Sequence, residues 1–84
     1  MEVEDIFSIS GRGTIVTGKI KNGILKLNEK IIVIEDNFKK KTVVTGIELF
    51  NKLLDEAKEG NNVGILLHGV EKEEIKKGYI IFKD

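Results

Sequence analysis

The sequence predicts an all-β fold, a small closed antiparallel barrel. About six or seven short runs of β-branched and aliphatic residues alternate with turn residues, at roughly the 8–12-residue spacing typical of barrels and sandwiches. The 84 residues include nine glycines and no proline, which suits tight turns between short strands better than a helical bundle. A chain of this length supports one modest core, so residues 1–84 are interpreted as a single domain.

The first half of the chain is predicted to be entirely strand and turn. Residues 3–10 and 13–21 are expected to pair through a turn on Gly11-Arg12-Gly13, because glycine allows the positive φ of a tight connection. Asn22-Gly23 is the strongest short-range hairpin signal, since both residues tolerate the left-handed conformation of a type I′ turn. Strands are also expected over 24–27 and over 31–34, a continuous apolar run typical of a buried strand.

The second half predicts one interruption of the β pattern. A long strand is expected over 42–50, with a bulge at Gly46, because glycine weakens a strand unless the backbone must bend there. In residues 51–59, leucine and alanine have near-helical spacing, which predicts one or two helical turns ended by Gly60. The remaining elements expected are a strand over 62–70, a brief helical winding over 71–77 and a last strand over 79–82.

Composition and charge exclude several function classes. Fourteen basic and fourteen acidic residues give no net charge, so DNA binding by bulk electrostatics is not expected and any RNA contact must be local. With no cysteine and one histidine, His68, no disulfide, metal site or cofactor is expected. No apolar run approaches the roughly 20 residues that span a bilayer. The acidic N-terminus is unlike a signal peptide, so we expect no membrane partner and a cytoplasmic location.

Enzymatic activity is not expected from any motif. Residues 13–20 nearly match a phosphate-binding loop, but Ile20 replaces the magnesium-binding hydroxyl and the intervening residues favour a strand. Glu4 and Asp5 are adjacent and would point to opposite faces of a strand, so they do not suit an acid/base pair. The lysines at 39–41 are interpreted as a solvated edge in preference to a phosphate contact.

Four ordered segments carry a resemblance to a known family. They are E-D-I-F-S-I-S-G-R-G-T-I-V-T-G at 4–18, T-G-I-E-L-F-N-K-L-L-D-E-A at 45–57, G-N-N-V-G-I-L-L-H-G-V at 60–70 and E-E-I-K-K-G at 73–78. They resemble domain 2 of bacterial elongation factor Tu, in the translational GTPase family. The resemblance implies a six-stranded Greek-key barrel that follows a GTP-hydrolysing domain and helps bind the aminoacylated 3′ end of tRNA.

The resemblance also implies roles for individual residues. Glu48 would accept a hydrogen bond from the terminal ribose hydroxyl, and Ile15 and Leu66 would pack against the terminal adenine. The residues implied to border the amino acid are Glu4, Asp5, Phe7, Thr17, Phe50 and Asn62. Such a grouping is physically reasonable, because RNA ends are recognised by packing a base on an apolar surface and reading hydroxyls with polar groups.

Three departures from the family pattern bear on partners. The family usually carries arginine where Asn51 and His68 stand, and the segment at 38–41 is more basic than usual. The 84 residues contain no phosphate-binding loop, so the implied role is non-catalytic. They supply only part of a pocket, so weak binding to aminoacyl-tRNA or ribosomal RNA is expected. The alternative is a barrel that contacts a GTPase domain, another translation protein or the ribosome without binding tRNA.

Overall fold

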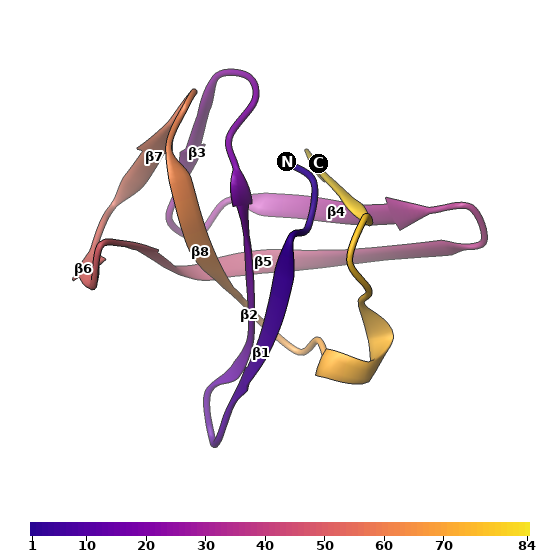
Figure 1. Ribbon diagram of the computed structural model, residues 1–84. Coiled ribbons are helices and arrows are strands. Elements are labelled where there is room, and N and C mark those ends of the chain that lie inside the picture. Colours follow the sequence, from indigo (N-terminus) through magenta and orange to yellow (C-terminus); the bar gives the residue numbers. More distant parts are fainter.

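The computed structural model describes residues 1–84 and consists of short β-strands with one 3₁₀ turn, η1 (Figure 1). The elements are β1 (Asp5–Ile9), β2 (Gly13–Lys19), β3 (Ile24–Lys26), β4 (Lys30–Glu35), β5 (Phe38–Leu49), β6 (Lys52–Leu53), β7 (Glu56–Lys58), β8 (Asn62–Leu67), η1 (Lys72–Glu74) and β9 (Ile80–Lys83). Every strand pairing is antiparallel, which confirms the predicted all-β class. No helix has the length and apolar character needed to cross a lipid bilayer.

The larger sheet leaves its two end strands unpaired with each other. Its order is β1-β2-β8-β5-β4-β9, with β6 added to β5, while β3 and β7 form a separate two-stranded sheet. Strand pairing therefore does not close the expected barrel. Residues 1–3 span part of the gap between β1 and β9, where Val3 N–H donates to the Tyr79 carbonyl and Ile81 N–H to the Met1 carbonyl, each at 2.8 Å. The two chain ends consequently lie close together (Figure 1).

The hairpin predicted at Asn22-Gly23 is wrong. β2 pairs with β8, and β3 pairs with β7, the strand that precedes β8, so the ladder continues past a bend. Gly60 N–H donates to the Ile20 carbonyl at 2.8 Å and carries the pairing across this bend. Of the two turn residues only Gly23 has a positive φ, 69°, whereas a type I′ turn requires it at both. The pairing of β2 with β8 and of β3 with β7 therefore outweighs the local turn preference of Asn22-Gly23.

The helical turns predicted over residues 51–59 are also absent. Phe50 and Asn51 have φ of 50° and 63° and connect β5 to β6, which is the pattern of a two-residue type I′ hairpin. The chain then forms β7, which pairs with β3 and buries Ala57. A helix of one or two turns is only marginally stable, so pairing of this segment with β5 and β3 is preferred.

The bulge predicted in the long strand is confirmed. The register between β5 and β8 shifts between Val44 and Gly46, which leaves Thr45 without a residue opposite it. After this shift Ile47 points into the core, with 1% of its surface exposed, while Gly46 and Glu48 face outward. The bulge thus sets which side of β5 carries Glu48.

One apolar cluster lies inside the strands. Its members alternate along the strands with outward-facing residues, as expected where one face of an antiparallel sheet is buried. The buried residues are Val3, Val16, Ile20, Leu25, Ile31, Val33, Val44, Ile47, Ala57, Val63, Ile65, Leu67, Val70, Ile75 and Ile81.

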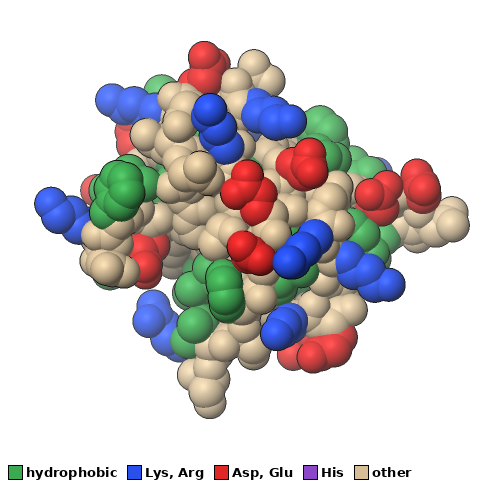
Figure 2. Space-filling model, viewed as in Figure 1, with side chains coloured by type: hydrophobic (Ala, Val, Ile, Leu, Met, Phe, Trp, Pro, Cys, Tyr) green, Lys and Arg blue, Asp and Glu red, His purple; other side chains and the backbone are tan.

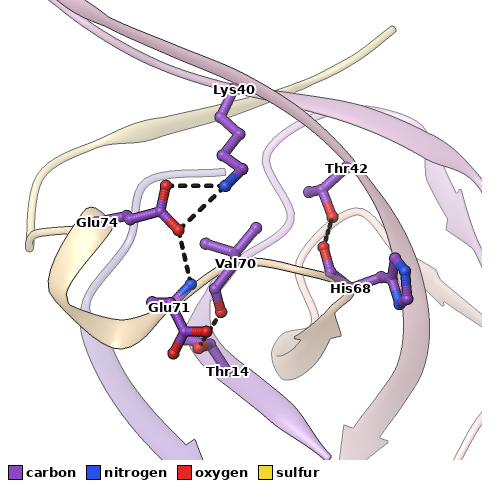
Figure 3. Close-up of polar contacts among 7 residues, drawn as sticks. All are labelled: Thr14, Lys40, Thr42, His68, Val70, Glu71 and Glu74. Carbon is purple, nitrogen blue, oxygen red and sulfur yellow. Dashed lines mark hydrogen bonds and ion pairs between the residues drawn. The ribbon is translucent and has the colours of Figure 1, made fainter.

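Two threonines fix the segment that leaves β8 (Figure 3). The Thr14 hydroxyl of β2 donates to the Val70 carbonyl, and the Thr42 hydroxyl of β5 donates to the His68 carbonyl. Both threonines are buried, so each hydroxyl has the partner that its burial requires.

An ion pair ties η1 to β5 (Figure 3). The Lys40 ammonium donates to both carboxylate oxygens of Glu74, at 3.0 and 2.8 Å, and Glu71 N–H donates to Glu74 Oε1 at 2.9 Å. The Glu71 N–H and then Lys40 lower the pKa of Glu74. Lys40 is therefore not part of a solvated edge, whereas Lys39 and Lys41 are exposed.

Candidate nucleic-acid interface

Four strands present one continuous surface, which we call the outer face. It is formed by the outward side chains of β1, β2, β8 and β5, which are neighbours in the sheet. Val16 and Ile65 point into the core with no exposed surface, so residues on either side of them in β2 and β8 point outward. Core packing on one side of the sheet therefore fixes which residues the outer face displays.

The side chains of the outer face form two rows that run across the strands. One row joins a residue of each strand in the order Phe7, Ile15, Leu66 and Gly46, and the other in the order Asp5, Thr17, Gly64 and Glu48. Paired strands lie about 4.8 Å apart, so each row is a line of touching neighbours. Six of the residues implied by the resemblance, from three separate parts of the sequence, thus lie on one surface.

Two glycines lie in the middle of the outer face, and neighbouring side chains pack against them. A Cβ atom at Gly64 would lie 3.3 Å from Cγ2 of Ile15 and 3.8 Å from Cγ2 of Thr17. A Cβ atom at Gly46 would lie 3.3 Å from Cβ of Leu66. Side chains at these positions would therefore crowd Ile15 and Leu66. Glycine lets these two apolar side chains lie close against the sheet, with Ile15 and Thr17 on one side of Gly64 and Glu48 on the other.

Apolar and acidic groups meet around these glycines. Glu48 is exposed and lies diagonally across from Leu66 on the neighbouring strand, a separation of about 7–8 Å. Ile15 is half-buried, but Leu66 exposes only 9% of its surface and offers less contact area than the resemblance implies. Ile15 therefore supplies most of the apolar area beside Glu48.

The other three implied residues surround the rows. Phe50 lies in the β5–β6 turn with 88% of its surface exposed, and its positive φ is rare for a bulky side chain. Asn62 is exposed at the start of β8, opposite Lys19. Glu4 is exposed just before β1, and its N–H donates to the Thr17 carbonyl at 2.8 Å. They lie at the border of the outer face and not within its rows.

The charges on this part of the molecule are mixed. Asp5 forms an ion pair with Lys77, at 3.3 Å, and both side chains are largely exposed. Figure 2 shows acidic and basic side chains interspersed with apolar groups over the visible surface, without a patch of one sign. No cluster of three or more potential metal ligands is present. The geometry suits local polar recognition better than electrostatic attraction of a long phosphate backbone.

Sequence reasoning missed Leu53. This residue pairs with Glu48 across β5 and β6 and exposes 76% of its surface, so it adds apolar area beside the carboxylate. The predicted helix over residues 51–59 concealed it, because Leu53 was expected on a helical face. The only sequence signal for the β5–β6 turn was Asn51, because asparagine tolerates a left-handed conformation. Phe50 masked this signal, because phenylalanine rarely adopts that conformation.

A comparison with family models adds an independent finding. The model described as elongation factor Tu domain 2 matches residues 13–82. The matched range includes β2, β5 and β8, the three strands that carry Ile15, Glu48 and Leu66.

Proposed function

Because the chain belongs to the elongation factor Tu domain 2 family, we propose that its outer face binds the aminoacylated 3′ end of tRNA. The role is non-catalytic binding within translation, in the cytoplasm. The proposal rests chiefly on one observation: Glu48 and Thr17 lie on either side of Gly64 in one cross-strand row, with Ile15 packed against Gly64 from the neighbouring row. A terminal nucleoside presents matching groups, an apolar base and ribose hydroxyls that donate hydrogen bonds.

Each part of the 3′ end has a proposed contact. The Glu48 carboxylate accepts a hydrogen bond from the terminal ribose, and such charge-assisted bonds are about twice as strong as neutral ones. Ile15 packs against the adenine, with Leu66 beneath it. The aminoacyl group lies toward the six residues that the resemblance implies for it, which are Glu4, Asp5, Phe7, Thr17, Phe50 and Asn62. The exposed Phe50 suits contact with varied side chains.

Binding by this chain alone is expected to be weak. Immobilising a ligand costs several kcal/mol, and the outer face is an open surface that contacts one side of the nucleoside. Asn51 and His68 provide no guanidinium for phosphate where the family usually carries arginine. We further propose that residues 1–3 hold the ends of the sheet together as a working barrel, in the six-stranded Greek-key arrangement of the family.

The test is a titration of ¹⁵N-labelled protein with aminoacyl-tRNA at low salt. Backbone amide signals near Glu48 and Asn62 are expected to shift, and deacylated tRNA should shift the Asn62 region less. Glu48→Gln keeps the shape of the side chain but removes its charge, and should weaken binding about tenfold. Glu59→Gln, an exposed carboxylate outside the rows, is the matched control. Unchanged amide signals near both Glu48 and Asn62 would refute the proposal.

A protein-binding role is the second candidate. Phe50 and Leu53, on one short hairpin, expose 88% and 76% of their surfaces, and adjacent exposed apolar groups are typical of interaction sites. In this alternative the hairpin docks on a GTPase domain, another translation protein or a ribosomal protein without tRNA. Protein association from cell extract that resists RNase and is lost in Leu53→Ser would favour it.

A further inference from the structure

The bend between β2 and β3, the uppermost loop in Figure 1, contains the pair Asn22-Gly23. Both residues are exposed. Gly23 has a φ of 69°, a left-handed conformation that glycine adopts without steric cost. A Cβ atom at Gly23 would meet no atom within 4 Å, so the space beside this residue is open. The backbone of the bend therefore favours glycine directly after Asn22, and no other part of the chain covers the pair.

The Gly23 nitrogen is not held by a hydrogen bond. Glu59 N–H donates to the Gly23 carbonyl at 2.9 Å, but the Gly23 N–H returns no bond, although residues paired in this way usually exchange both. The side-chain amide of Asn22 also makes no hydrogen bond to the protein. Neither the Asn22 amide nor the Gly23 nitrogen is therefore tied to another group, and the two can approach each other.

The remaining asparagines lack this arrangement, because each is followed by a residue that has a side chain. A side chain on the following residue hinders the approach of its backbone nitrogen to the asparagine amide, whereas glycine has none. Asn61 is restrained further, since its Oδ1 accepts a hydrogen bond from the Lys58 N–H at 2.8 Å. The asparagines compared with Asn22 are Asn28, Asn37, Asn51, Asn61 and Asn62.

We infer that Asn22-Gly23 is a site of spontaneous deamidation, which forms isoaspartate in the bend. The Gly23 nitrogen loses its proton to hydroxide and attacks Cγ of Asn22. A C–N bond forms, the bond from Cγ to Nδ2 breaks, and ammonia leaves with a proton taken from water. Water then opens the cyclic imide. Opening at the side-chain carbonyl gives aspartate, and opening at the main-chain carbonyl gives isoaspartate, whose backbone runs through the former side chain.

Isoaspartate adds a carbon atom to the main chain of a bend that joins the two sheets. Two hydrogen bonds cross this bend, from Glu59 N–H to the Gly23 carbonyl at 2.9 Å and from Gly60 N–H to the Ile20 carbonyl at 2.8 Å. A longer chain between Ile20 and Gly23 cannot keep both bonds in their present geometry. The modification therefore loosens the sheet of β3 and β7 from β2 and β8. It is separate from the outer face and independent of tRNA binding.

The first test follows the reaction in the folded protein at mildly alkaline pH, by peptide mapping with mass spectrometry and by methyl transfer from an isoaspartyl methyltransferase. Aspartate and isoaspartate should accumulate at residue 22 at least about tenfold faster than at any other asparagine, and in proportion to hydroxide concentration. A peptide of residues 18–26 gives the rate without the fold. Conversion of the peptide but not of the folded protein would overturn the inference, as would equal rates at Asn22 and Asn62.

The second test uses two variants. Gly23→Asn keeps a residue that tolerates positive φ but places a side chain beside the nitrogen, so it should slow conversion of Asn22 at least about tenfold. An unchanged rate would overturn the inference.

Asn22→Asp adds the negative charge without lengthening the chain. In this variant the amides of Glu59 and Gly60 should exchange with solvent as in the unmodified protein, whereas the purified isoaspartate form should exchange them at least about tenfold faster. Exchange in the isoaspartate form equal to that of Asn22→Asp would overturn the predicted loosening of the bend.

Discussion

Replacing Phe50-Asn51 by Asn-Gly is expected to stabilise the fold while weakening binding at the outer face. Both residues have positive φ, 50° and 63°, in the two-residue turn between β5 and β6. Asn-Gly is the preferred pair for such a turn, whereas a bulky side chain in this conformation is strained. Strain held at an exposed position suggests that the Phe50 side chain serves recognition rather than stability.

The magnitude follows from the turn conformation and the exposure of Phe50. The left-handed conformation costs an ordinary residue about 1–2 kcal/mol, which asparagine and glycine largely avoid. Phe50 is 88% exposed, so it buries about a tenth of a side-chain surface of roughly 200 Å², worth about 0.6 kcal/mol. The double variant should gain about 1 kcal/mol in the free energy of unfolding, or roughly 4–8 °C in Tm.

Urea and thermal denaturation followed by far-ultraviolet circular dichroism measure this gain. Phe82→Asn is the matched control, because Phe82 is 53% exposed and lies in a regular strand without positive φ. Losing about 100 Å² of burial there should lower the free energy of unfolding by about 2 kcal/mol. A loss of stability in the Phe50-Asn51 variant as large as that of Phe82→Asn would refute the reasoning, since the turn would then not be strained.

Three further outcomes are expected. Gly64→Val should displace Ile15 from its place beside Gly64 and weaken aminoacyl-tRNA binding by about tenfold or more, with about 1–3 kcal/mol lost in stability; unchanged affinity by titration would contradict the proposed site. Ile65→Ala, at a residue with no exposed surface, should lower the free energy of unfolding in urea by about 2–5 kcal/mol. The pKa of Glu74 is lowered from 4.5 in the fold, so its contribution is present above pH 4.5 and lost as pH falls through the lowered pKa. Glu74→Gln should therefore flatten the dependence of stability on pH below 4.5, and an unaltered slope would show that Lys40 and the Glu71 N–H do not favour the carboxylate.

The sequence was sufficient for features that depend on local pattern. Alternation in β2 and the apolar run in β4 predict strands, because a half-buried strand must place every second residue in the core. The bulge at Gly46 followed from the cost of glycine in a long strand. Asn22-Gly23 and residues 51–59 were mispredicted because their conformations depend on partners far away in the sequence. β3 and β7 pair with each other, and no local pattern encodes that pairing.

The candidate site was accessible from the sequence only through resemblance. Alternation alone places Ile15 and Thr17 on one side of a strand, but it does not bring Glu48 beside them. That proximity requires the register of β8 against both β2 and β5, and the β5 register changes at the bulge. The match to elongation factor Tu domain 2 over residues 13–82 confirms the resemblance. The binding roles of individual residues stay predictions until a ligand is tested.

The strands of the outer face hold their side chains more rigidly than the β5–β6 turn holds Phe50. Ile15 lies between Thr14 and Val16, and Leu66 between Ile65 and Leu67, with every one of these neighbours 2% exposed or less. Their positions are fixed when the protein folds, so little ordering cost remains at binding. Phe50 has no buried neighbour in its turn and retains rotamer freedom. Under the proposed function, the rigid surface would contact the adenine, which is the same in every tRNA, and the exposed aromatic group would contact the amino acid, which varies.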